Sequence, residues 1–309
     1  MTAFTWLLKR EVWETRSVWF VPGILALLMV GGTLAAVLGL THVEFNGVGA
    51  SHDEATAFAA QMTPGKIAVM SSVGLTGLAQ PFLLLAVLTQ FFYSLGALYT
   101  ERQDRSILFW KSLPPSDTDT VLSKLCIASV VVPLAALAVA VVAVLLVSIL
   151  LTFHLRSMPL LTGTFWTFQV WGQALVVMVY AWLVIMVWTL PMVGFNLLIS
   201  AVSPRSPFMI SILLPIGIWF VDARVLGTHW LNAATMSWLR LLVDAYGEHG
   251  EGATNIISQE AVTMPGALVE ITRPLAFFGS PVLWAGLALT TGLVLGTIWV
   301  RRYRAAATG

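Results

Sequence analysis

Six apolar runs, each long enough to cross a lipid bilayer, divide this 309-residue chain and limit what it can fold into. A helix needs about 20 consecutive apolar residues to cross about 30 Å of hydrocarbon. Only 10% of the residues are charged, whereas soluble domains carry about 25%. We therefore predict an all-α integral membrane protein with six transmembrane helices. The runs lie at residues 18–40, 76–100, 122–152, 165–200, 208–228 and 281–300.

The segment before the first run is amphipathic. Its apolar side chains share one helical face, and its charged side chains fall mostly elsewhere. The apolar face comprises Phe4, Leu7, Leu8 and Val12. We predict that residues 1–17 form an interfacial helix and that residues 18–309 form the six-helix transmembrane domain. A secretory signal is the competing interpretation, but residues 18–40 are too long for one and lack a small-residue cleavage site.

Two runs are longer than a bilayer requires, so their helices must tilt, kink or project from the membrane. These are residues 122–152 and 165–200. Proline removes a backbone donor and clashes with the preceding turn, which bends or breaks a helix. We predict a kink at Pro191 in the fourth run and another at Pro215 in the fifth.

Lysine and arginine are distributed unevenly between the two sides of the predicted bundle. Eleven flank one side, the side that carries both chain ends and residues 101–121, and five flank the other. Cytoplasmic segments carry the excess of positive charge. We therefore expect both termini and the 101–121 loop to be cytoplasmic, and we expect residues 41–75 and 229–280 to lie outside.

The second outer segment predicts a helix of its own. Apolar residues recur at helical spacing between residues 230 and 245, and glycines follow. The repeating positions are Trp230, Leu231, Ala234, Trp238, Leu241, Leu242 and Ala245. The helix could lie on the outer membrane face or form a lid packed on the bundle, and we favour the lid.

The chain shows little that could carry out catalysis or ion coupling. It has no phosphate-binding loop, one cysteine and five scattered histidines. The runs are almost free of ionisable residues, which argues against an ion-coupled transporter or an intramembrane metalloprotease. Asp222 and Arg224 are exceptions, and we interpret them as snorkelling to the interface or as a functional or packing ion pair. Four polar residues favour helix–helix contacts over ligand binding: Gln90, Tyr93, Gln173 and Asn196.

Residues 99–125 form the most charge-dense stretch of comparable length. Four positive and four negative charges surround the apolar residues 107–110. This composition suits docking onto a folded protein, and it equally suits an aromatic belt with solvated charges between two membrane helices. Pro114 and Pro115 end any preceding helix, and Ser116 with Asp119 predicts a capping box that opens the next one.

At these residues the sequence resembles the permease subunit of ABC transporters of the ABC-2 export type. The matching residues are Leu98-Tyr99, Glu101-Arg102, residues 104–114, Ser116-Asp117 and residues 120–124. Gln103 and Pro115 depart from the family pattern. A weaker resemblance covers Leu190-Pro191, Gly194 and residues 197–207. The six runs, the N-terminal interfacial helix and the large segment before the last run also fit this family.

The resemblance implies a bacterial inner-membrane exporter subunit with no catalytic residues of its own. The loop after the second span would be a coupling helix that contacts a separate ATP-binding subunit. ATP and Mg²⁺ would bind to that partner, and the assembly would hold two permease chains, as a homodimer, and two ATPase chains. Contact residues would be Glu101, Arg102, Asp104 and Arg105 in rim ion pairs, Phe109 and Trp110 as apolar anchors, and Lys111 and Pro114 beside them.

A pathway that lacks charges favours an apolar or amphiphilic cargo, such as a lipid, lipopeptide or hydrophobic peptide. The near-zero net charge of +1 indicates no nucleic-acid partner. A membrane sensor or scaffold that binds a cytoplasmic partner through residues 101–121 is the alternative, and an intramembrane enzyme is a third. Small-residue motifs fit a dimer face or packing within one chain, namely Gly32/Ala36, Ala35/Gly39 and Gly292/Gly296.

Overall fold

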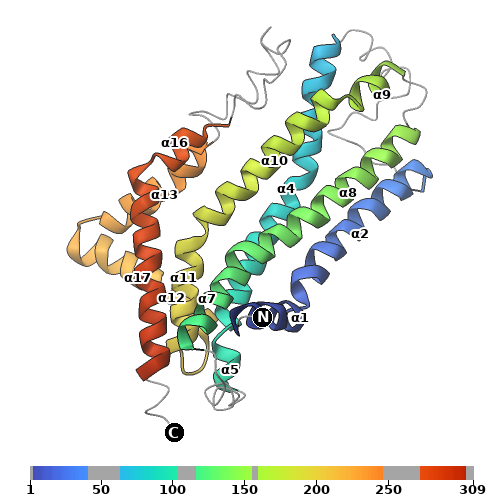
Figure 1. Ribbon diagram of the computed structural model, residues 1–309. Helices are drawn as coiled ribbons and strands as arrows, with labels where there is room; N and C mark the ends of the chain where they lie inside the picture. The colour runs from blue at the N-terminus through green and yellow to red at the C-terminus, as the bar shows by residue number, and fades with distance from the viewer. Residues whose placement is uncertain (1–2, 41–62, 104–115, 155–158, 246–271, 304–309) are drawn as a thin grey trace.

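The computed structural model describes residues 3–40, 63–103, 116–154, 159–245 and 272–303, and every element in these ranges is a helix (Figure 1). Six of them are long and apolar enough to cross a membrane, which confirms the predicted helical membrane fold. The spans are α2 (Ser17–Val37), α4 (Pro64–Gly96), α8 (Val132–His154) with α7 (Asp117–Cys126) before it, α10 (Phe168–Trp188), α12 (Pro207–Val221) and α17 (Pro281–Tyr303).

Helix α4 starts twelve residues before the predicted second span. Pro64 occupies its first turn, where a missing N–H costs nothing, and Thr63 caps it by accepting from the N–H of Lys66 at 3.4 Å. At ~1.5 Å per residue, its 33 residues reach about 50 Å, well beyond the hydrocarbon thickness. Residues 64–75 therefore continue the helix of the second span, while their predicted outer location stays a prediction.

The fourth apolar run is two helices where the sequence predicted one kinked span. Helix α10 ends at Trp188, and α11 (Leu190–Val202) starts after Thr189. Pro191 lies in the first turn of α11, where it needs no hydrogen bond but prevents the preceding helix from continuing. The separated α11 packs closely along α17, and a Cβ added at Gly194 would lie 3.4 Å from the Thr290 side chain.

The third span accommodates an internal proline through a π-helical turn. Residues 127–131 form this turn, and the N–H of Val132 donates to the carbonyl of Ile127. Pro133 follows directly and has no N–H to donate to Ser129. Because the wide turn absorbs the missing bond, α7, the π-turn and α8 form one continuous span over Asp117–His154.

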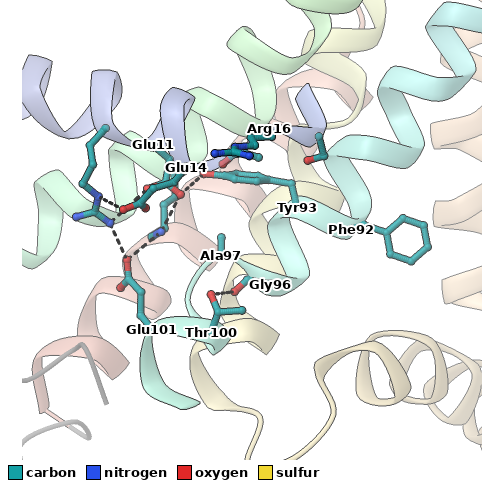
Figure 2. A pocket seen from close by; sticks show the side chains of 13 residues that line it. Glu11, Glu14, Arg16, Phe92, Tyr93, Gly96, Ala97, Thr100 and Glu101 are labelled. Atoms are coloured by element: carbon teal, nitrogen blue, oxygen red, sulfur yellow. Dashed lines mark hydrogen bonds and ion pairs between the residues drawn. The ribbon is translucent and has the colours of Figure 1, made fainter. Parts of the chain in front are cut away.

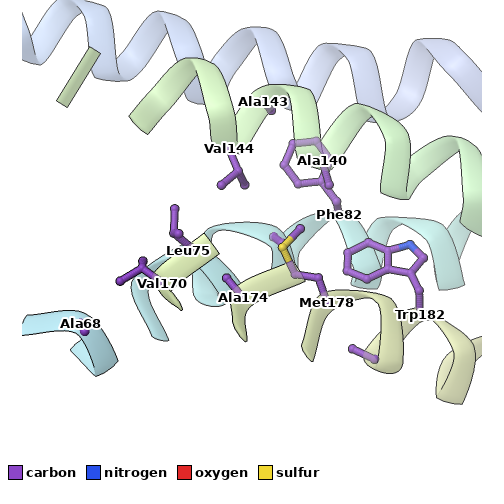
Figure 3. Packing of buried hydrophobic residues seen from close by; sticks show 12 residues of the cluster. Ala68, Leu75, Phe82, Ala140, Ala143, Val144, Val170, Ala174, Met178 and Trp182 are labelled. Atoms are coloured by element: carbon purple, nitrogen blue, oxygen red, sulfur yellow. The ribbon is translucent and has the colours of Figure 1, made fainter. Parts of the chain in front are cut away.

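The main hydrophobic core lies between α4, α8 and α10 (Figure 3). Phe82 and Trp182 are almost completely buried, and they pack where α8 presents small residues such as Ala140. Large side chains opposite small ones allow the three helices to approach closely. The remaining labelled members are Ala68, Leu75, Ala143, Val144, Val170, Ala174 and Met178.

A chain of buried hydrogen bonds ties α12 to this bundle. The amide of Asn196 on α11 donates to Ser94 Oγ on α4 at 3.1 Å and accepts from Ser211 Oγ on α12 at 2.7 Å. Ser211 is the only buried residue of α12. The predicted role of Asn196 as an interhelical link is therefore confirmed, whereas the equally buried Gln90 amide has no partner among the described residues.

Helix α13 (Trp230–Ala245) confirms the helix predicted in the second outer segment. Its second half packs on the bundle, with Leu241 and Ala245 against Tyr180 and Leu283, while Trp230 at the other end is exposed. The packed half agrees with the lid interpretation. Short helices α9 (Pro159–Phe165) and α16 (Pro274–Phe278) complete the end of the bundle opposite both chain termini (Figure 1).

Asp222 does not snorkel to the membrane surface. It lies in a π-turn over residues 222–226 and is only 1% exposed. Its carboxylate accepts hydrogen bonds from the Thr228 hydroxyl and from the N–H of Leu231, the latter at 3.0 Å. Gly227, with φ of +64°, turns the chain between these groups. Asp222 therefore caps α13, whereas Arg224 is exposed as snorkelling requires.

Candidate functional site

Four helical segments meet at the end of the bundle where α5 ends and α7 begins, here called the loop end (Figure 1). They are α1 (Ala3–Glu14), α5 (Tyr99–Gln103), the start of α7 and the last turn of α17. Helix α1 lies across the bundle at this end, and its Leu8 and Val12 pack against a core formed by Val18 and Ile127. The predicted amphipathic helix is thus present and rests on the bundle through its apolar face.

Glu101 lies at the centre of an ion-pair cluster at the loop end. Its side chain is buried, and one carboxylate oxygen lies 3.0 Å from Lys124 Nζ. The other oxygen accepts from Arg301 Nη1 at 2.9 Å. Arg301 also donates through Nε to Asp117 at 2.9 Å. Glu101 therefore joins α5 to α7 and α17.

Lys124 extends the cluster to α1. Its ammonium group donates to Glu11 Oε1 at 3.0 Å, and both side chains are buried. The Tyr93 hydroxyl donates to the same Glu11 oxygen at 2.8 Å. One lysine thus bridges two carboxylates from separate helices, and α4 contributes a neutral hydrogen-bond donor to the same site.

Arg10 lies along the side of the cluster that faces α1. Its guanidinium pairs with Glu14 at 3.1 Å and lies 3.8 Å from Glu11 and 3.7 Å from Glu101 (Figure 2). The cluster thus holds three cations and four carboxylates and has a net charge of −1. The members are Arg10, Glu11, Glu14, Glu101, Asp117, Lys124 and Arg301.

Burying these groups is favourable only because they are paired. An isolated buried ion costs several kcal/mol, about 3–5 kcal/mol when one partner of a pair is removed. Here every strongly buried ion has an opposite charge within 3.0 Å. The capping box of Ser116 and Asp119, confirmed at 3.1 and 3.3 Å, fixes the start of α7 and so positions Asp117 beside Arg301.

Arg102, the next residue along α5, binds to a different helix. Its guanidinium donates to the carbonyls of Ser200 and Ser203 at the end of α11, the second at 2.8 Å. The Ser200 hydroxyl accepts from the N–H groups of Leu98 and Tyr99 at 3.0 and 2.9 Å. A cation is favourable there because the C-terminal carbonyls of a helix carry partial negative charge. The start of the loop is therefore held on two sides.

The structure describes only two of the predicted partner contacts. Both Glu101 and Arg102 bind within the chain, so the carboxylate of Glu101 is turned into the protein and not toward a partner. The remaining predicted contacts lie outside the described residues, and their role stays a prediction. They are Asp104, Arg105, Phe109, Trp110, Lys111 and Pro114.

Sequence reasoning missed the cluster because it treated each charged residue as the solvated end of an apolar run. A signal was present, since Glu11, Glu101, Lys124 and Arg301 lie at or near the ends of four different runs and carry complementary charges. Among the described residues, no group of three or more His, Cys, Asp or Glu side chains could hold a metal ion.

Comparisons of the chain with protein-family models, curated proteins and solved structures find no match.

Proposed function

We propose that this chain is the permease subunit of an ATP-driven exporter of the ABC-2 type. A separate ATP-binding subunit would dock on residues 101–121, and two copies of each chain would form the working unit. The proposal is supported by the resemblance of residues 98–124 and 190–207 to that family and by the six membrane-spanning helices. The expected cargo is apolar or amphiphilic, and the expected location is a bacterial inner membrane with both termini cytoplasmic.

One observation favours this function over a passive scaffold: the residues at the start of the loop bind to several helices of the bundle. Glu101 binds to Lys124 on α7 and to Arg301 on α17. Arg102 binds to the end of α11. A displacement of the loop by a partner would therefore act on several membrane helices at once. ATP-driven closure of the partner pair would use this linkage to open a path for the cargo.

The loop contacts can be tested by co-purification with the ATP-binding protein encoded beside this chain. Trp110→Ala should weaken the complex by about tenfold or more, because buried tryptophan anchors dominate interface energies. Arg105→Ala should weaken it less, because Arg105 is expected in a rim ion pair. Arg302→Ala and Trp299→Ala are matched controls, since they remove the same side chains from exposed positions on α17. Complex formation and stimulated ATP hydrolysis that persist in both loop variants would disprove the proposal.

A further inference from the structure

A polar cavity of about 690 Å³ lies beside the ion-pair cluster, between α1, the start of α2 and α4 (Figure 2). Pockets for small ligands typically enclose about 300–1,000 Å³, so this cavity can hold a molecule of that size. Glu11, Glu101 and Lys124 line its inner wall. Thr15, Ser17 and Thr100 add hydroxyl groups to the lining. The cavity thus offers several polar groups to one ligand.

Two exposed residues of the cavity lining can make further contacts with a ligand. Glu14 has a 55% exposed side chain and pairs with Arg10 at 3.1 Å. Arg16, two residues further on, is exposed and forms no ion pair with any described residue. An exposed anionic side chain and an exposed cationic side chain therefore both line the cavity. The charged residues of the lining are three cations and three carboxylates, so the cavity suits a ligand that carries both charges and no net charge.

The cavity also borders an exposed aromatic surface on α4 and α12. Figure 2 shows Tyr93 pointing toward Glu11 while the neighbouring Phe92 points away from the cluster. Phe92 lines the cavity, is 60% exposed, and stacks on Phe208 of α12 with 6.2 Å between ring centroids. A ligand with a charged head at the rim could therefore lay an apolar tail along this aromatic surface.

We propose that this cavity binds the headgroup of a zwitterionic phospholipid that carries a primary amine. The phosphate lies against the Arg16 guanidinium, whose planar fork of donors suits phosphate oxygens. The ammonium lies against Glu14 and donates to the surrounding carboxylate and hydroxyl oxygens. A quaternary amine has no N–H to donate, so phosphatidylethanolamine is preferred over phosphatidylcholine. The inference does not depend on an ATP-binding partner, because it concerns this chain alone.

The site can be tested on the purified full-length chain in detergent, after removal of endogenous lipid. Isothermal titration uses dihexanoyl phosphatidylethanolamine, the matching phosphatidylglycerol and phosphatidylcholine, and free phosphoethanolamine. The phosphatidylethanolamine probe should bind saturably and more tightly than the other three. Arg16→Gln and Glu14→Gln should each raise its Kd by about tenfold, the effect of losing one charge-assisted contact. Lys9→Gln is the matched control, because Lys9 is an exposed cation on α1 outside the cavity lining and should leave Kd unchanged.

Each alternative result overturns a stated part of the proposal. Equal binding of phosphatidylglycerol would show that the amine is not recognised. Equal binding of free phosphoethanolamine would show a soluble ligand and not a bilayer lipid. An unchanged Kd in both the Arg16→Gln and Glu14→Gln variants would show that the lipid does not bind at this cavity. Both substituted residues are exposed, so unfolding is not expected, and thermal unfolding of each variant verifies that the fold is kept.

Discussion

Glu101 is the residue on which the loop end depends, because both of its carboxylate oxygens are occupied by cations from other helices. Its neighbour Arg102 turns toward the end of α11, so two adjacent side chains bind to different helices of the bundle. Neutral replacements of similar shape would keep the packing but leave charged partners unmatched. The cost of such a change falls on the partner groups, which remain buried without a counter-charge.

This dependence gives a stability prediction for the pair of Lys124 and Glu101. Lys124→Met should destabilise the protein by about 3–5 kcal/mol, because Glu11 and Glu101 then lose their shared ammonium group. The double variant Lys124→Met/Glu101→Gln should lose less than the sum of the two single changes. Unfolding in mixed detergent measures these free energies.

The matched control for this cycle is Lys66→Met, which removes an exposed lysine from the first turn of α4. It should change stability by no more than about 0.5 kcal/mol. Single variants that cost no more than this control, or effects that add without any coupling, would mean that the buried ion pairs contribute nothing measurable.

Sequence alone could identify these residues but not pair them. The partners of Glu101 lie 23 and 200 positions further along the chain. Each cluster residue looks like an ordinary charge at the end of a membrane span, and only the packing of helix ends decides which of them meet. The capping box at Ser116 and Asp119 could be predicted because both residues lie in one turn, where local geometry fixes the contact.

Among the elements, α13 shows how a single buried carboxylate can set the position of a helix. Asp222 belongs to the preceding π-turn, yet it accepts the N–H of Leu231 in the first turn of α13. The left-handed Gly227 brings the two segments together. Capping of this kind satisfies a donor that would otherwise be left without a partner at a helix start.

Asp222→Ala should therefore loosen the start of α13. The loss of a capping side chain costs about 1 kcal/mol, with a range of roughly 0.5–2 kcal/mol. Hydrogen exchange of residues 230–236 should become faster while exchange in the α4 core stays unchanged. Asp244→Ala is the control on the same helix, since a negative charge near a helix C-terminus is unfavourable and its removal should not destabilise. Unchanged exchange at residues 230–236 would refute the capping role.

The sequence predicted which segments form helices, but it predicted only some of the points at which those helices break. The apolar runs gave all six spans, and the period of about 3.6 residues between positions 230 and 245 predicted α13. Pro191 was identified as a disruption, but the sequence could not distinguish a kink from the full separation of α11. The π-turn before Pro133 has no sequence pattern beyond the proline itself, because a local kink would satisfy the same residue.

At the scale of the whole molecule, α12 is one of the two spans with the least cover from the described chain, with 11% of its apolar window buried against 6% for α2. Only Ser211 is buried on it, while large apolar side chains on several faces are exposed. The proposed homodimer would place a second copy against this helix. Lipid alone could also cover these side chains, so a measurement is needed to separate the two cases.

Cysteine cross-linking can make this distinction, because Cys126 is the only native cysteine. In a Cys126→Ala background, Leu213→Cys on α12 should form disulfide-linked dimers in membranes. Leu289→Cys on α17 is the control, since it replaces an equally exposed leucine on a different span. Cross-linking that is absent at position 213, or equally efficient at 289, would contradict a dimer built on α12.

The ion-pair cluster takes groups from both the first helix of the chain and the last. During synthesis, the four carboxylates of the cluster are made before Arg301, so they have only two of its three cations until α17 is made. A product that lacks α17 is left with four carboxylates and only two cations at the loop end.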